Sequence, residues 1–210
     1  MPVRIALIHA VTVAMAPVEA AFRALWPEAE RVNLLDDSLS PDRERDGELT
    51  PRMTARIEAL GEYAKSIGAE GILYTCSAFG EAIEAVARAS AIPVLKPNEA
   101  MFEDALAPGA RIGMLATFGP SVASMEREFR ALAATRGLAA EIETICVPEA
   151  MAALKAGDEA AHNQLLAEAA PRLAGHDAVM LAHFSTSRAQ ALVQERLACP
   201  VLTPRPAVPW

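Results

Sequence analysis

Short apolar runs alternate along the chain with longer amphipathic stretches, and this alternation predicts strands and helices in turn. Residues 3–8 form the first apolar run and predict a buried strand, and a helix is expected over 16–26, ending before Pro27. On the same grounds we expect strands over 31–35, 71–74, 92–95, 111–116, 140–146, 178–182 and 200–202, and helices over 80–90, 98–106, 120–136, 158–173 and 187–197.

Two segments of the first half are assigned from local signals. Residues 36–51 are rich in charge and contain Pro41 and Gly47, so a surface loop is expected there. Thr50 followed by Pro51 is typical of an N-cap and a first helical position, which predicts a helix to about residue 67. Strands that alternate with helices in this way favour parallel sheets covered on both faces.

The chain nearly repeats itself at an offset of 107 residues, without a gap. Arg4–Ile8 aligns with Arg111–Leu115, and Pro93–Leu95 aligns with Pro200–Leu202. Only two copies fit into 210 residues, so the repeat does not indicate a solenoid. The repeat instead predicts two similar α/β halves.

The expected fold class is therefore α/β, with two pseudo-symmetric halves. Each half is a short parallel sheet flanked by helices, and the active site is expected in the cleft between the halves. The first half spans residues 1–97 and is a candidate for completion by 203–210, and the second half spans 98–202.

Composition excludes several classes of function. The net charge is −8 and Lys and Arg form no cluster, so no nucleic-acid partner is expected. No apolar run approaches the roughly 18–20 residues that span a bilayer, and the short apolar N-terminal segment is not expected to be a secretory signal. A cytoplasmic protein is expected, with its state as a homo-oligomer left open. The three cysteines lack CxxC spacing and no phosphate-binding glycine motif occurs, so neither a metal nor a nucleotide cofactor is expected.

Cys76 is the first candidate for chemistry, because it lies between a predicted strand and a predicted helix. In open α/β sheets, ligands bind beyond the carboxyl ends of the strands. A helix N-terminus lowers the pKa of a thiol, so Cys76 is expected to form a thiolate. The alternative is a buried structural cysteine, which is the interpretation adopted for Cys146 and Cys199.

His183 occupies the position that matches Cys76 at the 107-residue offset, also at the end of a strand. An imidazole can donate or accept a proton near neutral pH, so His183 is expected to be the partner acid/base. His9 is a weaker candidate that would line the cleft and donate hydrogen bonds. His162 and His176 are expected to be solvated.

Hydroxyl side chains gather at the same predicted strand ends. They predict a pocket in which hydroxyls and backbone amides bind a carboxylate, although Ser and Thr also serve there as helix N-caps. The expected substrate-binding residues are His9, Thr75, Ser77, Ala78, Thr117, Ser185 and Thr186.

These turns resemble those of the aspartate/glutamate/hydantoin racemase superfamily, which also includes arylmalonate decarboxylase and maleate isomerase. The resemblance covers nearly the whole chain and includes the turns at Thr75–Ser77, Leu115–Thr117 and Leu181–Ser185. It implies a cysteine from each half on either side of the substrate's α-carbon, one removing a proton and the other delivering one, without a cofactor. Here the first cysteine is Cys76, whereas His183 stands at the second position.

The resemblance implies an isomerase or racemase that acts beside the carboxylate of a small acid, such as an amino acid or a hydantoin. Two alternatives stay open. One is an arylmalonate-type decarboxylase, in which a single protonating thiol is enough, and the other is a non-catalytic protein that binds a small acid. The family usually closes with a helix after the last strand, whereas the proline-rich segment Pro204–Trp210 cannot extend one.

Overall fold

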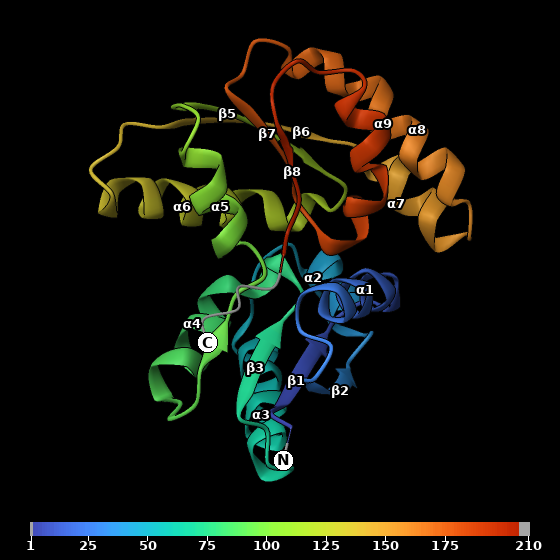
Figure 1. Cartoon of the computed structure of the whole chain (residues 1–210). Helices are drawn as coiled ribbons and strands as arrows, with labels where there is room; N and C mark the ends of the chain where they lie inside the picture. Colours follow the sequence, from blue (N-terminus) through green and yellow to red (C-terminus); the bar gives the residue numbers. More distant parts are fainter. Residues whose placement is uncertain (1, 206–210) are drawn as a thin grey trace. The chain divides into compact units, whose positions relative to one another are not determined.

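The computed structural model describes residues 2–205, which divide into two units, residues 2–97 and 98–205. Each unit contains its own four-stranded parallel sheet with helices around it (Figure 1). The expected α/β class and the parallel sheets are confirmed. The expected return of 203–210 to the first half lies mostly outside the described residues. Within them, Arg205 Nε donates to Asp104 Oδ2 at 2.8 Å, so residue 205 is tied to the second unit.

In the first unit the strands run in the order β2-β1-β3-β4. Its elements are β1 Arg4–His9, α1 Met15–Leu25, β2 Glu30–Leu35, α2 Leu39–Asp46, α3 Pro51–Ser66, β3 Gly71–Tyr74, α4 Gly80–Ala89 and β4 Val94–Leu95, with short 3₁₀ helices η1 at Thr12–Ala14 and η2 at Ser77–Phe79.

The second unit has the same strand order, β6-β5-β7-β8. Its elements are α5 Glu99–Leu106, β5 Arg111–Ala116, α6 Gly119–Thr135, β6 Glu141–Cys146, α7 Pro148–Lys155, α8 Glu159–Ala169, β7 Ala178–Leu181, α9 Gln190–Gln194 and β8 Val201–Leu202, with 3₁₀ helices η3 at Ala170–Leu173 and η4 at Phe184–Ala189.

Strand register shows where the internal repeat holds. Ile5 pairs with Gly71, and Ile112 pairs with Ala178, so β1, β3 and their counterparts keep the offset of 107 seen in the sequence. The second strand does not keep it, because Arg4 pairs with Glu30 but Arg111 pairs with Glu141. The expected gap-free repeat is therefore wrong at this point, and extra residues precede β6.

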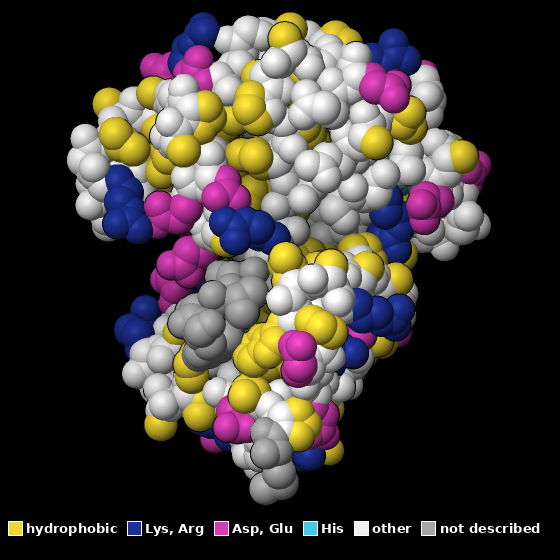
Figure 2. Space-filling view, viewed as in Figure 1, with side chains coloured by type: hydrophobic (Ala, Val, Ile, Leu, Met, Phe, Trp, Pro, Cys, Tyr) yellow, Lys and Arg dark blue, Asp and Glu magenta, His cyan; other side chains and the backbone are white. Residues whose placement is uncertain are grey.

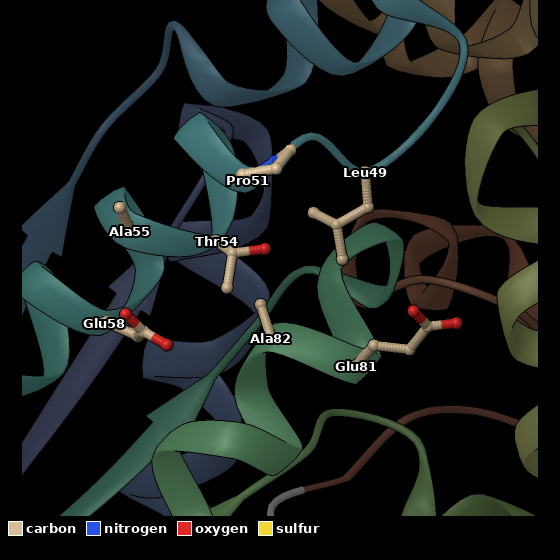
Figure 3. Close-up of a pocket in the computed structure, with 7 residues that line it drawn as sticks. All are labelled: Leu49, Pro51, Thr54, Ala55, Glu58, Glu81 and Ala82. Atoms are coloured by element: carbon tan, nitrogen blue, oxygen red, sulfur yellow. The ribbon is translucent and has the colours of Figure 1, made fainter.

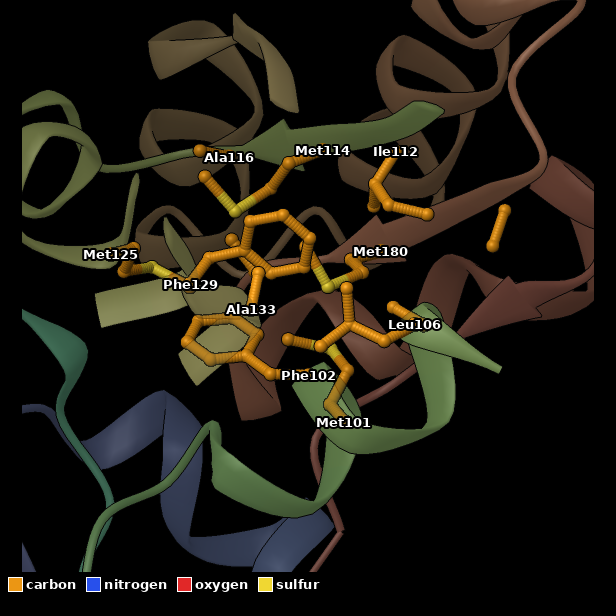
Figure 4. Packing of buried hydrophobic residues seen from close by; sticks show 13 residues of the cluster. Met101, Phe102, Leu106, Ile112, Met114, Ala116, Met125, Phe129, Ala133 and Met180 are labelled. Atoms are coloured by element: carbon orange, nitrogen blue, oxygen red, sulfur yellow. The ribbon is translucent and has the colours of Figure 1, made fainter. Parts of the chain in front are cut away.

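The core of the second unit lies on both faces of its sheet. On one face, the Phe102 ring of α5 meets the Phe129 ring of α6 edge to face, with centroids 5.6 Å apart. Met114 and Met180 pack against these rings from β5 and β7 (Figure 4). On the other face, Leu181 packs with residues of α8 and α9. A sheet buried on both faces needs apolar residues at consecutive positions, and this is why β5 and β7 are continuous apolar runs.

In the first unit, Tyr74 at the end of β3 is fully buried, and its hydroxyl donates to the Ile57 carbonyl of α3 at 2.7 Å. Gly61 makes room for this hydroxyl, because a Cβ at residue 61 would lie 2.8 Å from it. The end of β3, two residues before Cys76, is thereby fixed against α3.

The helix α3 begins as predicted. Thr50 adopts an extended conformation, its hydroxyl accepts the Met53 N–H at 3.3 Å, and Pro51 stands in the first turn. The expected loop over 36–51 is wrong, because α2 lies within it. The segment is highly charged and lacks an apolar stripe, so it does not show the pattern of an amphipathic helix. The helix α7, at Pro148–Lys155, was not predicted either.

On the face drawn in Figure 2, Lys and Arg side chains lie in separate small groups, mostly with Asp or Glu beside them. None of the helices within residues 2–205 is long and apolar enough to cross a membrane.

Candidate functional site

The carboxyl edge of the first sheet brings the predicted residues of this unit together. Ile8 pairs with Tyr74, so the next residues, His9 and Thr75, are neighbours, and Ala10 and Cys76 follow them. His9 Nδ1 lies 2.9 Å from the Thr75 hydroxyl, and His9 Nε2 lies 2.8 Å from Asn33 Oδ1.

The hydrogen bonds of His9 define the direction of its protons. Burial lowers the pKa of His9, so the imidazole is neutral at pH 7 and carries one N–H. Because Asn33 Oδ1 can only accept, that proton is on Nε2, and Nδ1 accepts from the Thr75 hydroxyl. Asn33 in turn donates to Glu19 Oε1 at 3.0 Å. Thr75 was predicted to bind substrate through its side chain, but its hydroxyl proton is directed inward.

Cys76 stands between β3 and η2, as the sequence predicted. Its extended backbone, with φ −116° and ψ 120°, makes it the N-cap residue of η2. A small hollow of about 10 Å³ is lined by Cys76, by His9 and by apolar groups such as Ile57 and Ile83. This is close to the lower limit for one water molecule.

The electrostatic environment of Cys76 corrects one expectation. Burial raises the pKa of the Cys76 thiol, whereas the sequence predicted a lowered pKa from the helix N-terminus. The short helix η2 supplies one N–H contact, from Ala78, which acts in the opposite direction but does not overcome desolvation. The resting group at pH 7 is therefore a thiol with thiolate-stabilising neighbours.

Two further residues around Cys76, Ser40 and Arg43, were missed by the sequence analysis because both lie in the segment expected to be a loop. The Ser40 hydroxyl and the Arg43 charge both act to lower the pKa of Cys76. Ser40 Oγ also lies 3.1 Å from the Ala10 carbonyl, and Arg43 Nε lies 3.4 Å from the Ala78 carbonyl. Both side chains are buried, with Arg43 only 8% exposed. The burial of Arg43 marks this site in the structure. The sequence does not show it, because a charged segment is expected to be exposed.

In the second unit, His183 follows β7 and is the N-cap residue of η4. The register of Leu115 with Leu181 makes Thr117 and His183 neighbours at the carboxyl edge of this sheet. Burial lowers the pKa of His183 to about 4, and repulsion from the His162 imidazole contributes. At pH 7 the His183 imidazole is neutral and can accept a proton.

The hydroxyls of the second unit differ in availability. Thr186 Oγ1 accepts the His183 N–H at 3.1 Å and lies 2.6 Å from the His183 carbonyl, so it caps η4, as the helix-cap alternative anticipated. Thr117 Oγ1 is buried and has no hydrogen-bond partner among residues 2–205. Ser185 is buried at the start of η4. Thr117 is therefore the hydroxyl best placed to bind a ligand.

Three expectations about other residues are wrong. His162 was expected to be solvated, but it is fully buried on α8, with Nδ1 2.7 Å from Asn163 Oδ1. Cys146 and Cys199 were expected to be buried, but Cys146 is exposed at the end of β6 and Cys199 is half-buried. A strand end and a loop leave these thiols only partly covered.

A larger hollow of about 400 Å³ lies in the first unit, against α3 and α4. Glu58 and Glu81 project at its margin (Figure 3). Two carboxylates oppose the binding of an anion, so this hollow does not suit a carboxylate ligand. Within residues 2–205, no group of three or more His, Cys, Asp and Glu side chains is arranged to hold a metal ion.

The sequence matches the family model described as Asp/Glu/Hydantoin racemase over residues 9–208. A search of curated protein sequences finds no significant match.

Solved structures of similar fold include several racemases. A glutamate racemase from Bacillus anthracis superposes with a TM-score of 0.75 at 15% identity, covering 96% of this chain and 76% of the other. An aspartate racemase from Picrophilus torridus gives 0.71 at 15% identity, covering 96% and 88%. An allantoin racemase from Pseudomonas fluorescens gives 0.67 at 13% identity, covering 95% and 85%. At these identities the likeness concerns the fold.

Proposed function

Because the chain belongs to the Asp/Glu/hydantoin racemase family, we propose that it is a racemase of small acids whose two acid/base groups are Cys76 and His183. The observation that carries the proposal is the equivalent position of the two groups, each two residues past the end of an inner parallel strand, and their protonation states are complementary in addition. Cys76 is a thiol with a raised pKa at the end of β3, and His183 is a neutral imidazole with a lowered pKa at the end of β7. One group can therefore donate a proton at pH 7 while the other accepts one, and no cofactor is required.

The proposed reaction moves two protons. His183 takes the α-proton of one enantiomer, which gives an imidazolium and an enolate-like intermediate. The Cys76 thiol then donates its proton to the opposite face of the same carbon and becomes a thiolate. The resulting thiolate and imidazolium are the two states needed for the other enantiomer, so the cycle closes without a further reagent. The proposal requires both groups to reach one carbon from opposite faces.

Neighbours of Cys76 support its change of charge. While the sulfur carries a proton, Ser40 can donate its hydroxyl to the Ala10 carbonyl 3.1 Å away. When the thiolate forms, that hydroxyl can turn toward the sulfur, and the Arg43 guanidinium and Ala78 N–H stabilise the negative charge. These groups act on charge that develops during the reaction, which is how preorganised dipoles accelerate a step.

The substrate carboxylate is proposed to accept hydrogen bonds from backbone N–H groups at the starts of η2 and η4 and from the hydroxyl of Thr117. Thr117 is the strongest of the side-chain candidates, because its oxygen is buried and unpartnered among the described residues. Ser77 and Ser185 lie at the same two strand ends. Thr75 and Thr186 would hold the backbone in place.

An arylmalonate-type decarboxylase is the second candidate, and the protonation state of Cys76 favours it. Loss of carbon dioxide generates the carbanion directly, so a single protonated thiol completes the reaction. His183, with a pKa of about 4, is a weak base and would then serve only to position the substrate.

Incubation of amino acids, hydantoins and substituted malonates with the protein in deuterated water tests the two candidates together. Deuterium at the α-carbon with loss of optical rotation supports the racemase. Release of carbon dioxide with a deuterated product supports the decarboxylase. If a substrate binds but shows neither deuterium exchange nor release of carbon dioxide, both activities are rejected for that substrate.

A further inference from the structure

Helix α2 carries Ser40 and Arg43, yet little in its own sequence holds it in place. It has eight residues, and helices shorter than about 12–15 residues are marginal in isolation. Leu39 is its one buried apolar side chain, and its other buried positions are Ser40 and Arg43. Its position therefore depends on polar contacts with the rest of the unit.

Arg56 on α3 supplies those contacts. Its Nε and Nη2 donate to the Asp36 carboxylate at 3.0 and 2.6 Å, and its Nη1 donates to Asp42 Oδ2 at 2.6 Å. Asp36 lies three residues before α2 in the chain, and Asp42 lies within the helix. One guanidinium thus binds the carboxylates of both Asp36 and Asp42, and only 23% of the Arg56 side chain is exposed.

Asp36 links this cluster to the sheet edge. Its N–H donates to the His9 carbonyl at 3.1 Å, and its Oδ1 accepts the Ser38 hydroxyl at 2.7 Å at the entry to α2. The cluster therefore connects α3, α2 and the end of β1. Any displacement of Asp42 also moves Arg43, the next residue in the chain.

We propose that Arg56 is a positioning residue for the reaction, which holds α2 so that Ser40 and Arg43 stay beside Cys76. This rests on the proposed function of Cys76.

The corresponding helix of the second unit needs no such grip. α7 buries Ala150, Met151 and Leu154, which have the same sequence spacing as Leu39, Ser40 and Arg43. Apolar side chains at these positions anchor a helix by burial alone. The first unit has a hydroxyl and a cation at two of these positions, and there the ion pairs of Arg56 hold the helix instead.

Arg56→Met tests the proposal, with Arg45→Met as the matched control. Arg45 also pairs with Asp42, but its side chain is 64% exposed and its other ion pair is with Asp46. In a Cys146→Ala, Cys199→Ala background, iodoacetamide alkylation of Cys76 is measured against pH, together with kcat and KM on a substrate that exchanges deuterium.

In Arg56→Met we expect the midpoint of the alkylation profile to move to higher pH and kcat to fall about ten- to a hundredfold, the cost of a small misplacement. Arg45→Met should match the parent in both. An unchanged profile and kcat in a folded Arg56→Met protein would overturn the proposal. If Arg56→Met does not fold, Asp36→Asn weakens the same contact from the other side and must give the same shift.

Alkylation needs no turnover, so the two proposals can fail separately. A parent protein that turns over none of the substrates would count against the proposed function. A midpoint that shifts in Arg56→Met but not in Arg45→Met would still support the positioning role.

Discussion

The two units have the same sheet order but surround their key residues differently. In the first unit, α2 places a hydroxyl and a guanidinium, Ser40 and Arg43, beside Cys76. In the second, α7 buries Met151 and Leu154 at the same spacing, and His183 lies in surroundings that lower its pKa to about 4. The candidate residue follows an inner strand of the sheet in each unit, but its surroundings differ. Ser40, Arg43 and the Ala78 N–H favour a charged Cys76, whereas burial and the His162 imidazole disfavour a charged His183.

The same contrast appears between the first strands. β1 ends in His9, which joins Thr75 and Asn33 in a chain of hydrogen bonds that reaches Glu19. β5 ends in Ala116, which cannot join such a chain. Glu126 instead accepts the Thr144 hydroxyl at 2.7 Å, so the outer part of the network persists in the second unit while its inner part is lost.

The largest effect is expected from Cys76→Ala. Removal of the thiol takes away one of the two proposed proton-transfer groups, and groups of this kind contribute about 10²- to 10⁴-fold in rate. The rate of racemisation, measured by optical rotation, should fall by a factor near the upper end of this range. The exposed Cys146 is the control, since Cys146→Ala should retain full activity. Equal losses of activity in both variants would contradict the proposed role of Cys76 in proton transfer.

Arg43→Met makes the first unit resemble the apolar second one at a single position. The variant loses the cation that favours the thiolate, so we expect racemisation to fall about 10²-fold or more. The midpoint of Cys76 alkylation should also move to higher pH. Leu154→Met, which keeps the apolar character of the second unit, should leave both unchanged. Unchanged alkylation in Arg43→Met would contradict the electrostatic role.

His183→Leu should change how stability depends on pH. Because the folded pKa of about 4 lies below the unfolded value of about 6.5, the unfolded state binds more protons in this window. The wild type therefore loses stability as the pH falls from 6.5 to 4, by roughly 2–3 kcal/mol from this group. Urea unfolding at pH 6.5 and pH 4.5 should show a smaller loss in the variant. Equal losses would mean that His183 titrates normally.

The smallest effects are expected where the units are alike. α3 is capped by Thr50, and α8 is capped by Asp158, whose carboxylate accepts the Ala161 N–H at 2.9 Å. Replacing either with Ala removes a cap and should cost about 1 kcal/mol of unfolding free energy. Thermal melts of the two variants should show similar shifts. A much larger loss for one would mean that the two helices are held differently.

Sequence patterns predicted the parts of the fold that depend on continuous apolar runs and on local caps. The strand ends before Cys76 and His183 and the Thr50 cap are of this kind. The helix α2 could not be predicted, because only its contacts with distant residues such as Arg56 make it stable. The raised pKa of Cys76 was missed for a related reason, since desolvation depends on packing and not on position in a turn.

Deuterium exchange measured separately on each enantiomer tests the central claim most directly. The wild type should exchange the α-proton of both enantiomers. If Cys76 and His183 act on opposite faces, Cys76→Ala should keep slow exchange of one enantiomer only, and His183→Ala of the other only. If both variants lose exchange with the same enantiomer, or if His183→Ala racemises the substrate at the wild-type rate, the two-base account is contradicted.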